Sequence, residues 1–123
     1  MVVTVRRLTP MASVASVPRS IAFYEQLGFT AGNTFAPPGA EEPTWAWLEC
    51  GDVPLMVTAN NESVSSGRHT VLFYLYVDDV KAMHVELRSK GMQVGAIASP
   101  FYAPYGEFEL IDPDGYVLMI THV

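Results

Sequence analysis

The pattern of hydrophobic and polar positions divides the 123-residue chain into two similar halves. Each half begins with a stretch of alternating apolar residues, continues with apolar residues at helical spacing, and ends with three more alternating stretches. The predicted strands are residues 4–14, 29–35, 44–50 and 53–59 in the first half and 70–77, 93–98, 106–111 and 116–122 in the second. The order βαβββ is therefore predicted twice, in repeat units of about residues 4–59 and 70–122.

Each predicted helix has a start and a stop signal. Ser16 can cap the first helix, and Gly28 can end it in the left-handed conformation. Asp79 and Gly91 hold the same places around the second helix. Gly28 and Gly91 lie 63 positions apart, and the same offset carries Leu55-Met56-Val57 onto Leu118-Met119-Ile120. The two halves are therefore predicted to be copies of one unit.

Length and composition narrow the class of protein. A chain of this length is predicted to form one domain, residues 1–123. With 7 basic and 13 acidic residues the net charge is −6, which argues against nucleic acid as a partner. No apolar run reaches the ~20 residues of a membrane span. A single cysteine, Cys50, suits a reducing compartment, and the early Arg6 and Arg7 disfavour a signal peptide. Both features predict a cytoplasmic protein.

Two motifs resemble those of a known superfamily. The stretch "RSIAFYEQLGF" (19–29) follows the first predicted strand, and "DPDGYVLMI" (112–120) ends the second unit. Together with βαβββ twice, they resemble the vicinal oxygen chelate superfamily of glyoxalases, bleomycin-resistance proteins and extradiol dioxygenases. The resemblance implies an α+β fold in which two repeats form a curved mixed sheet around a cavity, with the helices outside. It also implies a homodimer.

The resemblance further implies where a metal would bind. Enzymes of the superfamily hold a metal on His and Glu side chains, at positions that align with Thr9, Met56, Leu72 and Met119. None of the four can supply the oxygen, nitrogen or thiolate ligands that divalent metals need. His69, His84 and His122 are not spaced as a ligand set. We therefore expect no metal, no cofactor and no metal-dependent catalysis.

Strand parity predicts what lines the cavity instead. If the former ligand positions face inward, so do alternate residues on the same strands. Ala46 is then expected inside, whereas Trp45 and Trp47 are expected in the core. Phe101, Tyr102 and Tyr105 lie in a loop that could rim the mouth. The predicted ligand-binding residues are Met11, Ser13, Met56, Tyr74, Tyr76, Tyr105, Glu107, Glu109 and Met119.

Carboxylates, aromatic rings and adaptable methionines suit a cationic or aromatic ligand. The sequence therefore favours a metal-free small-molecule-binding protein, similar to the antibiotic-sequestering, bleomycin-resistance-like branch of the superfamily. No catalytic residue is assigned. An alternative is a metal-independent lyase or isomerase that uses Glu107 or Glu109 as a general base. A dimeric scaffold without a ligand is the third interpretation.

Overall fold

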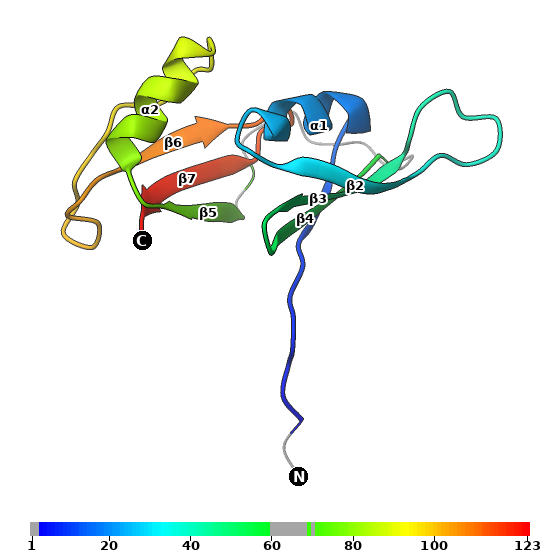
Figure 1. Cartoon of the computed structure of the whole chain (residues 1–123), viewed down its shortest axis with the longest axis horizontal. Coiled ribbons are helices and arrows are strands. Elements are labelled where there is room, and N and C mark those ends of the chain that lie inside the picture. The colour runs from blue at the N-terminus through cyan, green and yellow to red at the C-terminus, as the bar shows by residue number, and fades with distance from the viewer. Residues whose placement is uncertain (1–2, 60–68, 70) are drawn as a thin grey trace. The chain divides into compact units, whose positions relative to one another are not determined.

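A computed structural model describes residues 3–59, 69 and 71–123. Its contacts divide the chain into two compact units, Met1–Val64 and Ser65–Val123, and each is described by itself (Figure 1). That the two units form one domain stays a prediction. Most of the predicted linker, residues 60–69, and the first residue of the predicted strand 70–77 lie outside the described residues.

The first unit is one helix on a four-stranded sheet. Its elements are β1 (Met11–Ser13), α1 (Val17–Glu25), β2 (Thr30–Phe35), β3 (Trp45–Cys50) and β4 (Val53–Thr58). The strand order is β1-β4-β3-β2, with β1 parallel to β4 and the other neighbours antiparallel. Helix α1 contacts β2, β3 and β4, and the side chains between helix and sheet form the core of this unit.

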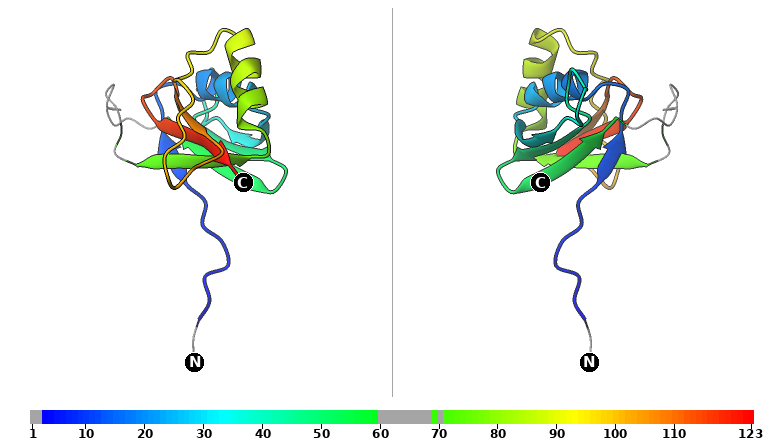
Figure 2. Two further views of the ribbon diagram at one scale, coloured as in Figure 1. Left: turned by 90° about the vertical axis from the view of Figure 1, so that its left-hand side faces the viewer. Right: turned by 90° about the vertical axis from the view of Figure 1, so that its right-hand side faces the viewer.

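The second unit repeats this plan with a smaller sheet. Its elements are β5 (Leu72–Val77), α2 (Val80–Ser89), β6 (Glu107–Ile111) and β7 (Val117–His122). The order is β5-β7-β6, with β5 parallel and β6 antiparallel to β7. Helix α2 contacts β6 and β7, and the views in Figure 2 show each helix on one face of its own sheet. The predicted α+β fold is confirmed.

The predicted ends of both helices are confirmed. The Ser16 hydroxyl accepts from the Arg19 amide at 3.3 Å, and the Asp79 carboxylate accepts from the Ala82 amide at 2.9 Å. These bonds satisfy amides that the first helical turn leaves without a partner. Gly28 and Gly91 follow the helices with φ of 97° and 80°, the left-handed region that glycine tolerates best.

Two of the predicted strands are longer than the structure shows, and these predictions are wrong. Within 4–14 only Met11–Ser13 is a strand, because β4 offers a parallel partner to those three residues alone. The predicted strand 93–98 is only two isolated bridges, Val94 to Leu110 and Ala98 to Glu107. The pairing register shifts by one residue between these bridges, so no continuous ladder forms.

The predicted placement of Ala46, Trp45 and Trp47 is also wrong. Ala46 is fully buried in the core, opposite Val57, whereas Trp47 pairs with Met56 on the other sheet face. The cause is the length of the two hairpin turns. Cys50 pairs with Val53 around a two-residue turn, whereas Ile111 and Val117 pair across residues 112–116. In β3 the residue that corresponds to Glu109 is therefore Trp47, 62 positions earlier and not 63. A shift of one residue along a strand moves each side chain to the opposite face of the sheet.

Candidate ligand-binding site

Strand register builds the floor of a site in the second unit. Tyr76 pairs with Thr121, and Thr121 pairs with Glu107, so these three side chains form one row across β5, β7 and β6. The next row is Tyr74, Met119 and Glu109. The turn at Asp112, whose carboxylate accepts from the amides of residues 114 and 116 at 2.9 Å, holds β6 and β7 in this register. The sheet thus carries acids, rings and a hydroxyl on one face.

A loop before β6 supplies the other side of the site. Residues 99–106 turn twice, with the Ala103 amide donating to Pro100 and the Gly106 amide donating to Ala103. Gly106 has φ of 102°, and this left-handed residue leads directly into Glu107. The loop carries Tyr102 above the floor, where its hydroxyl hydrogen-bonds to the Glu107 carboxylate.

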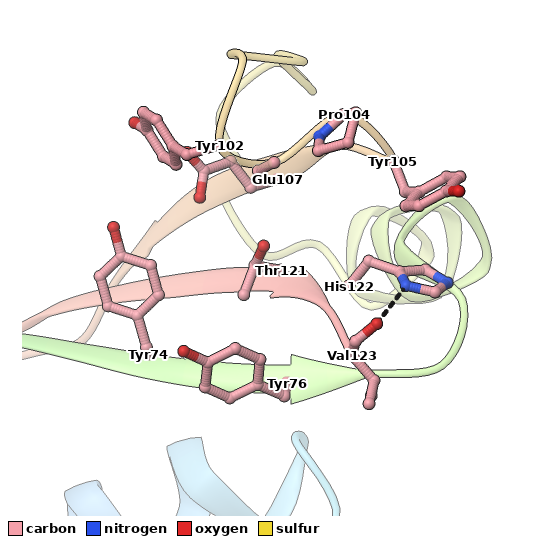
Figure 3. Close-up of a pocket in the computed structure, with 10 residues that line it drawn as sticks. Tyr74, Tyr76, Tyr102, Pro104, Tyr105, Glu107, Thr121, His122 and Val123 are labelled. Atoms are coloured by element: carbon pink, nitrogen blue, oxygen red, sulfur yellow. Dashed lines mark hydrogen bonds between the residues drawn. The ribbon is translucent and has the colours of Figure 1, made fainter.

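These two parts enclose a cavity of about 300 Å³ within the second unit. Figure 3 shows Tyr102 beside Glu107, with Tyr74 and Thr121 pointing into the same space. Its lining residues are Tyr74, Tyr76, Tyr102, Ala103, Pro104, Tyr105, Glu107, Thr121, His122 and Val123. A second cavity, of about 430 Å³, shares Pro104, Tyr105 and His122 with the first and adds Asp78, Asp79 and Lys81.

Glu107 dominates the electrostatics of the first cavity. Only 5% of its surface is exposed, and among the described residues its Oε2 atom has no hydrogen-bond partner. No lysine or arginine is among the described residues that line this cavity. The hydrogen bond to Glu107, with the negative charge of that carboxylate, raises the pKa of Tyr102 above its ordinary value of 10.0. A carboxylate so placed favours a cation.

The aromatic side chains surround this carboxylate from different elements. The rings of Tyr74 and Tyr76, both on β5, have their centroids 6.4 Å apart at an angle of 33°. Tyr105 and His122 lie with centroids 5.1 Å apart, and the His122 Nδ1 atom is 2.8 Å from the Val123 carbonyl oxygen. Tyr74, Tyr76 and Tyr105 each keep a large exposed area, so their faces are accessible to a ligand.

The structure brings together part of the predicted set. Of the nine residues, Tyr74, Tyr76, Tyr105 and Glu107 line the cavity. Glu109 and Met119 lie on the same sheet face in the neighbouring row but do not line it. The other three, Met11, Ser13 and Met56, belong to the sheet of the first unit. A role for these five residues in binding stays a prediction.

Sequence reasoning missed some of the lining. The sequence predicts Tyr102 only at the rim, but its hydroxyl hydrogen-bonds to the buried Glu107 carboxylate. His122 was given no role, although it lies in β7 and lines both cavities. The sequence signal for this region is the segment "SPFYAPYG" (99–106), which combines three aromatic residues with turn-forming proline and glycine just before a strand.

The four positions at which the resemblance would place a metal do not fit one in this chain. Leu72 and Met119 lie on adjacent strands of the second unit, and neither side chain offers a ligand for a divalent cation. Thr9 and Met56 of the first unit are no better suited. Across residues 3–59, 69 and 71–123, no group of three or more His, Cys, Asp or Glu side chains is placed to hold a metal ion.

The family of the chain follows from comparison of its sequence. Residues 7–120 match the model of the Glyoxalase/Bleomycin resistance protein/Dioxygenase superfamily, and the chain belongs to that superfamily. The chain matches none of the curated proteins with which it was compared. Neither of its helices, in the part of the chain that the structure describes, is long and apolar enough to cross a membrane.

Solved structures with the same fold include proteins of different function. A bleomycin resistance determinant encoded on the transposon Tn5 is 23% identical, with a TM-score of 0.71 over 96% of this chain and 98% of that one. A bleomycin-binding protein complexed with bleomycin is 24% identical, with a TM-score of 0.68 over 97% and 99%. The trypanothione-dependent glyoxalase I of Leishmania major is 23% identical, with a TM-score of 0.74 over 97% and 87%. At these identities the likeness shows the fold alone.

Proposed function

We propose that this protein binds a small cationic molecule with an aromatic or apolar part in the cavity of its second unit. It does so without a metal or other cofactor, as a cytoplasmic homodimer, and it sequesters the ligand rather than converting it. The observation that carries the proposal is Glu107: a buried carboxylate with one oxygen unpartnered among the described residues, in a cavity lined by four tyrosines.

The energetics favour an occupant with positive charge. A buried carboxylate is costly unless a cation or hydrogen-bond donors compensate it. Around Glu107, the hydroxyl of Tyr102 supplies one donor, and the lining residues in the described part of the chain include no lysine or arginine. Tyrosine faces attract cations by the ring quadrupole and also bury apolar surface. A ligand that brings both a charge and an apolar part satisfies both kinds of side chain.

Two of the related structures support sequestration as the role. They are a bleomycin resistance determinant and a bleomycin-binding protein with its drug bound. An antibiotic is therefore one class of ligand that we propose. Because these relatives are below 25% identity, the argument for binding rests on the cavity itself.

The alternative function is a metal-independent lyase or isomerase. One observation favours it: Glu107 and Tyr102 form a hydrogen-bonded pair of proton-transfer groups beside a cavity. In this scheme the Glu107 carboxylate removes a proton next to a carbonyl group, and the Tyr102 hydroxyl stabilises the developing negative charge. Turnover of a carbonyl compound that is lost in Glu107→Gln would establish this function over sequestration.

The experiment is calorimetric titration with a panel of cationic aromatic drugs. We expect at least one to bind, and Glu107→Gln, which removes the charge but keeps the shape, to weaken it about ten- to a hundredfold. Glu41→Gln, an exposed acid in the first unit, is the matched control and should bind as the unaltered protein does. Equal affinity in both variants would rule out the proposed use of Glu107. Light scattering and metal analysis of the same preparation test the homodimer and the absence of a metal.

A further inference from the structure

We infer that the cavity of the second unit selects a cation that carries at least one N–H group, that is, a protonated amine, amidine or guanidine, over a quaternary ammonium ion. This inference rests on the proposed function and names the chemical class of its ligand. The observation behind it is the unequal surroundings of the two Glu107 carboxylate oxygens.

One of the two carboxylate oxygens of Glu107 lacks a hydrogen-bond donor among the described residues. Tyr102 donates to it, whereas Oε2 is buried and has no partner among the residues that the structure describes. Thr121, directly opposite on β7, is buried beside it, but its hydroxyl does not bond to Oε2. A buried acceptor without a donor costs free energy that a ligand N–H group recovers.

A quaternary ammonium ion cannot make this bond. It has positive charge and it can lie against tyrosine faces, but it has no hydrogen to donate. A protonated amine has the same charge and adds a charge-assisted hydrogen bond, which is about twice as strong as a neutral one. A primary ammonium is also smaller than a quaternary one, so the preference identifies Glu107 as the acceptor only if it is lost when the carboxylate is removed.

Among the described residues that line the cavity, Glu107 has the only carboxylate side chain. The lining residues that the structure describes include no lysine or arginine. The remaining titratable side chains are the four tyrosines and His122, and the His122 Nδ1 atom already lies 2.8 Å from the carbonyl oxygen of Val123. Glu107 is thus the negatively charged side chain that can accept a hydrogen bond from an N–H group in this cavity.

The test uses three probes that share a benzyl group and differ in the group attached to it: benzylamine, benzyltrimethylammonium and benzyl alcohol. Their affinities for the full-length protein are measured at neutral pH by calorimetry or by competition with a drug from the panel. We expect benzylamine to bind at least about tenfold more tightly than either of the others. In Glu107→Gln the advantage over the quaternary ion should fall to within about threefold.

The outcomes separate this inference from the proposed function. If benzyltrimethylammonium binds as tightly as benzylamine and both are weakened by Glu107→Gln, the cation site stands and the N–H inference is overturned. If no cation binds more tightly than benzyl alcohol, both are overturned. A preference for benzylamine that persists unchanged in Glu107→Gln would also overturn the inference, because some other acceptor would then be responsible.

Discussion

Glu107 and Glu109 share a strand and a sheet face, yet only one of them is positioned to act on a ligand. Glu107 is almost fully buried and lines the cavity, whereas Glu109 is half-buried in the next row and does not. Tyr102, on the loop before β6, hydrogen-bonds to Glu107, whereas Tyr74 is the member of the second row that lines the cavity with it. At the scale of single residues, the chemistry of the site therefore depends on one carboxylate and the tyrosine above it.

The Tyr102 hydroxyl provides a direct test of this pair. Because Glu107 accepts its hydrogen bond and carries negative charge, the pKa of Tyr102 is raised above 10.0. A raised pKa means that the bond contributes to stability below about pH 10, the ordinary value for tyrosine, and that this contribution is lost as pH rises through the raised value. Ultraviolet absorbance titration, compared between the unaltered protein and Tyr102→Phe, should show that the missing tyrosine ionises above the ordinary value.

Glu107→Gln is the control for this titration. It removes the charge and leaves a neutral amide, so the pKa of Tyr102 should return toward its ordinary value. Ionisation of Tyr102 at or below that value in the unaltered protein would show that the bond to Glu107 does not persist in solution.

Strand parity was sufficient to predict the rows of the second unit but not the cavity. The alternation of residues 72–77 and the turn at Asp112-Pro113-Asp114-Gly115 predict that Glu109 lies opposite Met119, and the register confirms this. The conformation of residues 99–106 has no such period. The turns of this loop decide which side chains of the sheet it approaches, and these turns do not follow from apolar spacing.

Among the elements, hairpin turns had the largest effect on what could be predicted. The turn around Gly51-Asp52 and the turn over 112–116 differ in length, so the repeat offset changes by one between neighbouring strands. Helix caps need no such long-range information. Ser16 and Asp79 bond to amides three residues away, and a local pattern is enough to find them.

The turn that leads into β6 gives a prediction at this scale. Gly106 has φ of 102°, and a Cβ atom there would meet the Ile97 Cγ2 atom at 3.0 Å. Gly106→Ala therefore adds backbone strain and crowding, and should lower the free energy of unfolding by about 2–4 kcal/mol. Because the strain lies next to Glu107, binding of a cationic ligand should weaken as well. Denaturant unfolding and calorimetry measure the two effects.

Gly39 offers the matched control. It has φ of 86° in an exposed loop of the first unit, and a Cβ atom there would meet nothing within 4 Å. Gly39→Ala should cost only the left-handed strain, about 1–2 kcal/mol, and leave ligand affinity unchanged. Equal destabilisation by both substitutions would contradict the crowding against Ile97.

For the whole molecule, the repeat predicts two units but not how they cooperate. Each unit has its own helix, sheet and buried core, and the contacts of the chain separate into these two parts. Whether the two units fold cooperatively can be measured by substituting equivalent core residues, one in each unit. Leu48 and Leu110 are both buried, and they pair with Leu55 and Leu118 across corresponding hairpins. Leu→Ala at such a site costs about 2–5 kcal/mol.

If the chain is a single domain, a substitution that destabilises one unit must also lower the stability of the other. Both tryptophans, Trp45 and Trp47, lie in β3, so tryptophan fluorescence reports unfolding of the first unit. If the units fold as one domain, Leu110→Ala in the second unit should shift the fluorescence midpoint as far as Leu48→Ala does, and the circular dichroism transition should coincide with it. If the units unfold independently, Leu110→Ala leaves the fluorescence transition in place and splits it from the circular dichroism transition. That result would make the chain two domains, because the core of one unit would then contribute nothing to the stability of the other.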